Sequence, residues 1–429
     1  MSEYKTPLIL LAIGLFSILI VSGLGCPRET LAMDKKDCSV TIAPEESLQE
    51  TIDEVQTGSK ICLRKGRWNE GVVINKSLTI KGLEGKSEIY RTRENLLTIY
   101  ATAKAELVKL QNLKISSYAR GDGPRPIVFA EAPLVMEDCL ISQEEKSRKW
   151  GLIFAAGPSR QQQPLSLKVS DTSFNKVGLS IFPTEGSVKS LLKDSSVKSN
   201  YIGIQAGKLL SDGDDEYEGP RAEVVVDSCS IKGAVKGKES GIGVSLSHGA
   251  VLNLVNSNIT DFPNEGIEVI GAGEATVTSS VIKANGGNGI SLKDHSRARV
   301  IDSRITQNGG YGVAIQTGSC GLTEGTEAVG FLGSITGNKN KISENTRGPV
   351  CPEELSFLTR KKMEKPPLPT ISSIERDNAN NPELPLAMGS NPRRRLYDLV
   401  RTSKAYQFRL GYLLQFWLDR TDSVWSSRS

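Results

Sequence analysis

The stretch that decides the fold runs over residues 258–315 and reads NITDFPNEGIEVIGAGEATVTSSVIKANGGNGISLKDHSRARVIDSRITQNGGYGVAI. Its most regular feature is an aliphatic residue at fixed spacing, since Ile259, Ile282 and Ile305 are 23 residues apart. A second mark follows, a Gly that opens a short alternation of apolar residues, as in Gly266-Ile-Glu-Val269. The stretch therefore predicts short strands separated by turns, in units of 23 residues.

Both marks continue toward the amino terminus at wider and less even spacing. The first mark continues at Ile231, Val197, Phe174, Ile141, Ile115 and Ile80. The glycine mark is found in Gly178-Leu-Ser-Ile181, Gly203-Ile-Gln-Ala206, Gly289-Ile-Ser-Leu292 and Gly312-Val-Ala-Ile315. Asn recurs at Asn200, Asn285 and Asn308, where it can adopt a left-handed turn and bond to its counterparts in neighbouring units. One unit is too small to bury its apolar face alone, so the units must stack and share a core.

The pattern resembles the right-handed parallel β-helix of the pectin-lyase-like superfamily. The resemblance covers residues 37–352, from Ser47-Leu-Gln-Glu-Thr-Ile52 through Gly66-Arg-Trp-Asn-Glu70 to Cys351-Pro352. It implies an all-β solenoid of roughly nine to ten coils, stacked about 4.8 Å apart, with a short helix over residues 46–55 capping the first coil. A β-sandwich or a propeller is the competing interpretation, but either needs longer strands and hairpin turns. The activity stays open, since this fold carries lyases, hydrolases, isomerases and adhesins.

The two ends of the chain lie outside the repeat. Residues 8–24 form an uncharged apolar run, and the sequence that follows it resembles a bacterial lipoprotein cleavage site with Cys26 as the lipidated residue. An uncleaved signal anchor is the alternative. In both cases residues 1–26 predict export and attachment to a membrane, at the cell surface or in the periplasm. Residues 353–392 are expected to form a linker, and residues 393–429 a basic tail that is helical or weakly ordered.

Export would place the chain where disulfides form. Four cysteines flank the repeat, and we expect two disulfides that hold its ends, because repeat proteins fray first at their ends. These cysteines are Cys38, Cys62, Cys320 and Cys351. Cys139 and Cys229 fall inside the repeat and are expected to be small buried residues. Two His and five Met leave little for a transition-metal site, and a net charge of +4 does not indicate a nucleic-acid partner.

Coils longer than 23 residues carry their extra residues after the glycine-marked strand, so the insertions should lie along one edge of the cylinder. Residues 157–163 and 211–218 are two such insertions, and both histidines occupy the same turn in later coils. This edge predicts a ligand-binding site. Its candidate residues are Arg160, Asp212, His248, Asp294, His295 and Arg297.

The acidic insertion offers a second possibility, a calcium site, because hard cations require several oxygen ligands. The candidate ligands are Asp212, Asp214, Glu216 and Glu218. Pectate-type lyases of the resembled superfamily use calcium to neutralise a uronate carboxylate, whereas a solvated loop tip is the plain alternative. A polygalacturonase-type hydrolase would instead use Asp214, Asp215 and His248 for acid–base catalysis. The Asn-Thr-Asp element of those hydrolases is missing. No other cofactor is expected.

The function expected from these observations is that of a membrane-tethered monomer that binds an extended polysaccharide or another cell-surface polymer. A long, rigid, grooved cylinder suits an extended ligand. Two alternatives stay open. One is a polysaccharide lyase or glycoside hydrolase with its site on the loop edge, and the other is a structural surface protein or adhesin.

Overall fold

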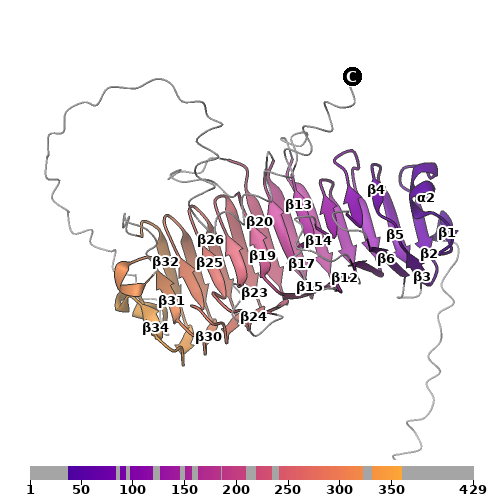
Figure 1. Ribbon diagram of the computed structural model, residues 1–429. Helices are drawn as coiled ribbons and strands as arrows, with labels where there is room; N and C mark the ends of the chain where they lie inside the picture. The colour runs from indigo at the N-terminus through magenta and orange to yellow at the C-terminus, as the bar shows by residue number, and fades with distance from the viewer. Residues whose placement is uncertain are drawn as a thin grey trace, which may run out of the picture.

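The computed structural model describes residues 37–83, 87–92, 97–118, 126–144, 150–156, 163–184, 186–208, 219–233, 241–321 and 331–359. Within them the chain winds into coils of three short strands, and corresponding strands of successive coils pair into three parallel sheets (Figure 1). The described residues supply twelve strands to sheet A and eleven each to sheets B and C. The fold is the parallel β-helix that the repeat predicts, with more coils than the nine to ten expected.

Each coil runs from sheet A through sheet B to sheet C. Sheet A contains β1 (Val40–Ile42), β2 (Lys60–Leu63), β5 (Leu78–Gly82), β8 (Val108–Gln111), β11 (Leu134–Glu137), β14 (Leu165–Ser170), β17 (Val188–Lys193), β20 (Ala222–Asp227), β23 (Ala250–Val255), β26 (Glu274–Thr278), β29 (Arg297–Ile301) and β32 (Ser334–Asn338). Sheet B contains β3 (Gly66–Trp68), β6 (Ser87–Arg91), β9 (Leu113–Ser117), β12 (Leu140–Gln143), β15 (Ser173–Lys176), β18 (Ser196–Ser199), β21 (Ser230–Gly233), β24 (Asn258–Thr260), β27 (Val281–Lys283), β30 (Arg304–Thr306) and β33 (Lys341–Ser343). Sheet C contains β4 (Val72–Ile74), β7 (Ile99–Ala101), β10 (Val128–Ala130), β13 (Trp150–Ala155), β16 (Gly178–Phe182), β19 (Ile202–Ala206), β22 (Ile242–Leu246), β25 (Ile267–Val269), β28 (Ile290–Leu292), β31 (Tyr311–Ile315) and β34 (Gly348–Cys351).

The stack of apolar marks expected from the repeat is confirmed from Ile115 to Ile305, where each marked residue pairs in register with the next along sheet B. Ile80 is the exception, because it lies in sheet A, and Ile115 pairs with Ile89 instead. Ile89 in turn pairs with Trp68. Strands of both sheets bury alternate aliphatic residues, so the pattern alone does not tell one sheet from the other. Too few coils were expected because the first coil, with Trp68 at the marked position, was not recognised.

A ladder of hydroxyl groups lies where the chain turns from sheet A to sheet B. The turn passes through one residue of left-handed backbone, such as Asn256 with φ 49°. The next residue is buried, and in successive coils its hydroxyl accepts a backbone N–H from the coil before. Cys229 N–H donates to Ser257 Oγ (3.0 Å), and Ser257 N–H donates to Ser280 Oγ (3.2 Å). The ladder satisfies amides that would otherwise be buried without a partner.

A second ladder, of asparagines, lies at the turn from sheet B to sheet C. Asn285 N–H donates to Asn308 Oδ1 (3.1 Å), and Asn308 N–H donates to Asn345 Oδ1 (3.0 Å). The bonding between coils is therefore as expected at Asn285 and Asn308, but the expected left-handed conformation falls on the preceding residue, for example Gln307 with φ 59°. This arrangement leaves the Asn side chain buried, where it can bond along the stack.

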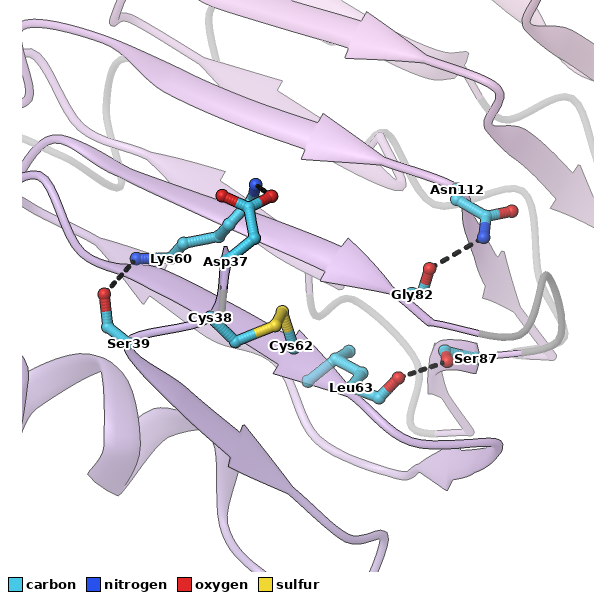
Figure 2. Close-up of a disulfide and its surroundings, with 9 residues drawn as sticks. All are labelled: Asp37, Cys38, Ser39, Lys60, Cys62, Leu63, Gly82, Ser87 and Asn112. Atoms are coloured by element: carbon cyan, nitrogen blue, oxygen red, sulfur yellow. Dashed lines mark hydrogen bonds and ion pairs between the residues drawn. A yellow bond between two sulfur atoms is a disulfide. The ribbon is translucent and has the colours of Figure 1, made fainter. Parts of the chain in front are cut away.

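The first coil is covered by α2 (Leu48–Glu54), which lies inside the helix expected over residues 46–55. Ser47 caps it by accepting the Glu50 N–H at 3.2 Å, and the helix buries Leu48 and Ile52. A disulfide joins Cys38 to Cys62 beside this end, as Figure 2 shows. Around it Asp37 pairs with Lys60, and the Lys60 N–H donates to Ser39 Oγ at 3.0 Å.

The last coil is closed by η4 (Gly318–Cys320), η5 (Glu353–Thr359) and a disulfide between Cys320 and Cys351. The linker expected over residues 353–392 is therefore wrong at its start, because residues 353–359 form a capping helix. Leu355 and Leu358 of η5 are buried, since they cover the open end of the apolar core.

The predicted membrane segment (1–26), the rest of the linker and the tail (393–429) lie outside the described residues. Among the residues that the structure describes, there is no helix with both the length and the apolar character needed to cross a bilayer.

Candidate functional site

The turns that join sheet C to sheet A form what we call the turn edge. Its described residues are 207–208, 247–249, 270–273, 293–296 and 316–317. Strands β22, β25 and β28 pair in register, so the turns that follow them stack one coil apart, about 4.8 Å. The turn edge is thus the described part of the edge on which the sequence places the candidate site.

His248 and Asp294 lie two coils apart, on the two sides of Gly271. The imidazole of His248 lies against Gly271, where an added Cβ would be 2.2 Å from the ring Cε1. Gly271 also has a φ of 57°, and its N–H donates to Asp294 Oδ2 at 3.1 Å. Asp294 N–H in turn donates to Gln316 Oε1 of the next coil at 2.7 Å. Glycine is required at position 271 because the ring occupies the space of a side chain.

His295 and Arg297 lie at the border of this edge. His295 is half-buried, next to the exposed Asp294. Arg297 begins β29, so it belongs to the outer surface of sheet A, where its guanidinium lies 3.7 Å from the Glu274 carboxylate. The structure therefore places Arg297 on a different surface from His248 and Asp294.

The other candidate residues lie outside the described residues. They are Arg160, Asp212, Asp214, Asp215, Glu216, Glu218 and Cys26. Calcium binding by the acidic insertion stays a prediction. Within the described segments, no group of three or more His, Cys, Asp or Glu side chains is placed to hold a metal ion.

A row of polar side chains lies on the outer face of sheet C and was not predicted from the sequence. It is formed by the third residue of each glycine-marked strand, which points away from the core. Its members, each paired in register with the next, are Ser180, Gln205, Ser245, Glu268 and Ser291. All five are buried, and Ser180 Oγ has no hydrogen-bond partner among the residues that the structure describes. The alternation that marked the strands carried this signal, because a polar residue between two aliphatic ones must face outward.

An ion pair connects this row to the turn edge. Glu268 Oε1 lies 3.3 Å from Lys293 Nζ, and both side chains are largely buried. Toward the amino terminus the same face becomes apolar, with Phe129 and Phe182 buried beside Tyr100. The Tyr100 hydroxyl donates to Glu131 at 2.6 Å. The Glu268 carboxylate and the Lys293 amine thus lie where face and edge join, and His248 is on the coil before Glu268. Imidazole, carboxylate and amine groups bind hydroxylated ligands or transfer protons.

A buried charge cluster lies on sheet B near the amino-terminal end. Glu88 is bonded by Arg67 (2.8 Å) and Lys114 (3.1 Å), and it accepts hydrogen bonds from Ser116 and Tyr118. Burial by itself would raise the pKa of Glu88, but the hydrogen bonds from Ser116, Tyr118 and Lys114 outweigh it, so the pKa lies below its ordinary value. Its charges are mutually satisfied, which fits a structural link between coils.

The two cysteines inside the repeat are buried and unpaired, as expected. Burial raises the pKa of Cys139 to about 12 and that of Cys229 to about 11. Both thiols therefore stay protonated, and neither has the thiolate character that a nucleophile needs.

Comparison with known proteins agrees with this architecture. The family described as right handed beta helix region matches residues 220–348. No curated protein matches the chain in sequence. Among solved structures, a mutant of the periplasmic alginate epimerase AlgG is 13% identical with a TM-score of 0.46, over 75% of this chain and 82% of that one.

Two further structures are similar at the same level. Tailspike protein 3 of bacteriophage CBA120 is 11% identical with a TM-score of 0.45, over 73% of this chain and 57% of that one. Pectate lyase Pel9A is 12% identical with a TM-score of 0.41, over 73% and 78%. At these identities and TM-scores, none of the three structures supports a substrate or an activity for this chain. The chain has the right-handed parallel β-helix fold.

Proposed function

We propose that this chain is an exported protein that binds an extended polysaccharide along the turn edge. The observation that supports this best is the stacking of His248, Gly271 and Asp294 on successive coils, beside the Glu268–Lys293 pair. Hydrogen-bonding side chains two coils apart, about 9.6 Å, match a polymer that presents hydroxyl groups at a regular step. The cylinder also supplies a long rigid support, so little ordering entropy is lost on binding.

The test is binding of the full chain to a panel of immobilised neutral and acidic polysaccharides. Asp294→Asn should weaken binding about fivefold, since it removes a charge-assisted hydrogen bond to the ligand but keeps an oxygen for the Gly271 N–H. Asp302→Asn is the matched control, because Asp302 is also exposed and left-handed (φ 49°) but lies on the turn between sheets A and B. Equal affinity of the two variants would contradict the proposed edge.

A catalytic step is the alternative that His248, Glu268 and Lys293 favour, because these side chains can donate or abstract protons. Release of unsaturated uronides from an acidic polysaccharide would identify a lyase, and new reducing ends without unsaturation a hydrolase. Loss of that activity in Lys293→Met, with binding retained, would assign it to this edge. A chain that neither binds nor cleaves any member of the panel would instead be a structural surface protein or adhesin.

Export and membrane attachment are part of the same proposal. They are supported by the apolar run at residues 8–24 and by the two disulfides, which persist in oxidising compartments. Cell fractionation should find the full chain with the membrane. Mass spectrometry of the mature amino terminus tells the two forms of attachment apart, because a lipidated Cys26 would be the first residue and an uncleaved anchor would retain residues 8–24.

A further inference from the structure

A line of exposed cations runs along the outer face of sheet B in its carboxyl-terminal half. We call it the basic strip. Its members are Lys198, Lys232, Lys283, Arg304 and Lys341. The register of the sheet fixes their positions, because each lies next to a residue of the buried stack that includes Val197 and Ile282. Side chains on either side of a buried strand residue face outward.

The strip covers six consecutive coils and is interrupted at one of them. Lys198 pairs with Lys232, which pairs with Thr260, and Thr260 pairs with Lys283. Arg304 and Lys341 pair with each other on the two coils that follow, in the adjacent outward row. At one coil per 4.8 Å, the five cations span about 24 Å along the cylinder axis.

The charge of the strip is largely uncompensated by the described residues. Strands β18, β21, β24, β27, β30 and β33 contain no Asp or Glu. Lys232 lies 3.4 Å from Asp261, and the described part of the chain gives the other four members no acidic partner within 4.0 Å.

Other outer surfaces of the cylinder differ in this respect. On sheet A, Lys189 pairs with Glu223 at 3.3 Å and Arg297 with Glu274 at 3.7 Å. At the amino-terminal end of sheet B, Glu88 and Glu144 neutralise Lys114. Pairing between neighbouring coils is therefore common in this fold, and its near absence along the strip leaves a linear positive field.

Small polar groups lie among the cations. Thr260 stands between Lys232 and Lys283, and the adjacent outward row contains Ser196, Ser230 and Asn258. These side chains are short, so they do not block access to the cations, and they can form hydrogen bonds with a ligand along the strip. The strip thus combines repeating positive charge with repeating donors over several coils, which suits a linear anionic chain better than a compact ligand.

We propose that the basic strip binds a linear acidic polysaccharide, whose carboxylate or other anionic groups repeat along the chain. That the polymer is a sugar rests on the proposed function, whereas its negative charge is inferred from the strip alone. The strip and the turn edge lie on different faces, so they would contact either two strands of polymer or two parts of one strand.

The experiment measures binding of the full chain to polygalacturonate and to a neutral galactan, at low and at physiological salt. We expect tighter binding to polygalacturonate and a loss of affinity as salt rises. The variant K198Q/K232Q/K283Q should bind polygalacturonate about tenfold more weakly. The matched control K168Q/K189Q/K193Q removes the same charge from exposed positions of sheet A and should stay within about twofold of the wild type.

Equal loss in the two triple variants would overturn the proposal, because net charge and not the strip would then govern binding. Binding to anionic phospholipid vesicles without binding to polygalacturonate would overturn it in favour of a membrane surface. If Asp294→Asn weakens binding and the strip variant does not, the proposed function stands and the strip is excluded. The reverse result would retain the strip and exclude the turn edge.

Discussion

At the scale of single residues, the hydroxyl ladder makes Ser257 a sensitive position. Ser257 Oγ accepts the Cys229 N–H (3.0 Å) and donates to the Val255 carbonyl (2.7 Å). Ser257→Ala leaves that buried N–H without a partner, so we expect a loss of about 1–3 kcal/mol in the free energy of unfolding. Ser230→Ala, at an exposed position of β21 one coil earlier, should change the free energy of unfolding by less than about 0.5 kcal/mol. Urea denaturation measures both, and equal values would contradict a role for the ladder.

Cys229 occupies the same ladder position as Ser257 one coil away, and this makes a second prediction. Its thiol donates to the Asp227 carbonyl at 3.2 Å, much as the serine hydroxyls do. Cys229→Ser should therefore keep the free energy of unfolding within about 1 kcal/mol of the wild type, whereas Cys229→Val should cost more because it leaves that carbonyl without the side-chain donor. A serine variant less stable than the valine variant in the same denaturation assay would contradict this account.

The sequence predicted the asparagine ladder, but neither the hydroxyl ladder nor the residues beside the asparagines. Asn285 and Asn308 were recognisable because they recur at the same place in successive units, where their side chains bond to one another. The left-handed conformation of Gln307 could not be recognised, because an exposed side chain at this position leaves no repeating pattern in the sequence. The Glu268–Lys293 pair was equally hidden, because it depends on which turn folds beside which strand.

At the scale of strands, the cluster around Glu88 links β3, β6, β9 and the end of β12 through charged side chains. Its lowered pKa means that the ionised carboxylate favours the folded state. This stabilisation is present above the ordinary Glu pKa of about 4.3 and is lost as the pH falls through the lower pKa of the folded state. Sheet B should therefore be weakest at its amino-terminal end in acid.

Glu88→Gln tests this link. At neutral pH the variant should lose about 1.5–3 kcal/mol of unfolding free energy, because Lys114 and Arg67 lose a buried partner. The difference from the wild type should shrink below about pH 4, where the wild-type carboxylate is itself becoming protonated. Glu144→Gln is the control, since Glu144 also pairs with Lys114 but is more exposed, and it should cost less than about 1 kcal/mol. A pH-independent difference would contradict the explanation.

Ile80 was assigned to the wrong strand, because it was expected in sheet B and lies in sheet A. The apolar mark identified sheet B from Ile115 to Ile305, including the long coils between Ile141 and Phe174 and between Val197 and Ile231. It failed at Ile80, where an alternating strand of sheet A imitates the mark and the true partner, Ile89, stands only a few residues further on. Period-two alternation shows which side chains are buried, and only the three-dimensional register shows in which sheet.

For the whole molecule, stability should be distributed along the cylinder, because each coil contacts only its neighbours. The disulfides Cys38–Cys62 and Cys320–Cys351 lie at its two ends, next to α2 and η5. By closing loops of 24 and 31 residues, each should stabilise its end by about 3 kcal/mol. The central coils have no such link among the described residues and depend on their shared core and ladders.

Reduction of both disulfides should therefore loosen the ends and spare the centre. In hydrogen exchange followed by mass spectrometry, residues 40–63 and 341–358 should exchange faster after reduction, while residues 222–292 keep their protection. The variant Cys38→Ser/Cys62→Ser should reproduce the effect at the first end alone, which excludes a general effect of the reductant. Equal acceleration along the whole cylinder would mean that the coils unfold as one cooperative unit, and the nearest-neighbour description of this fold would then be wrong.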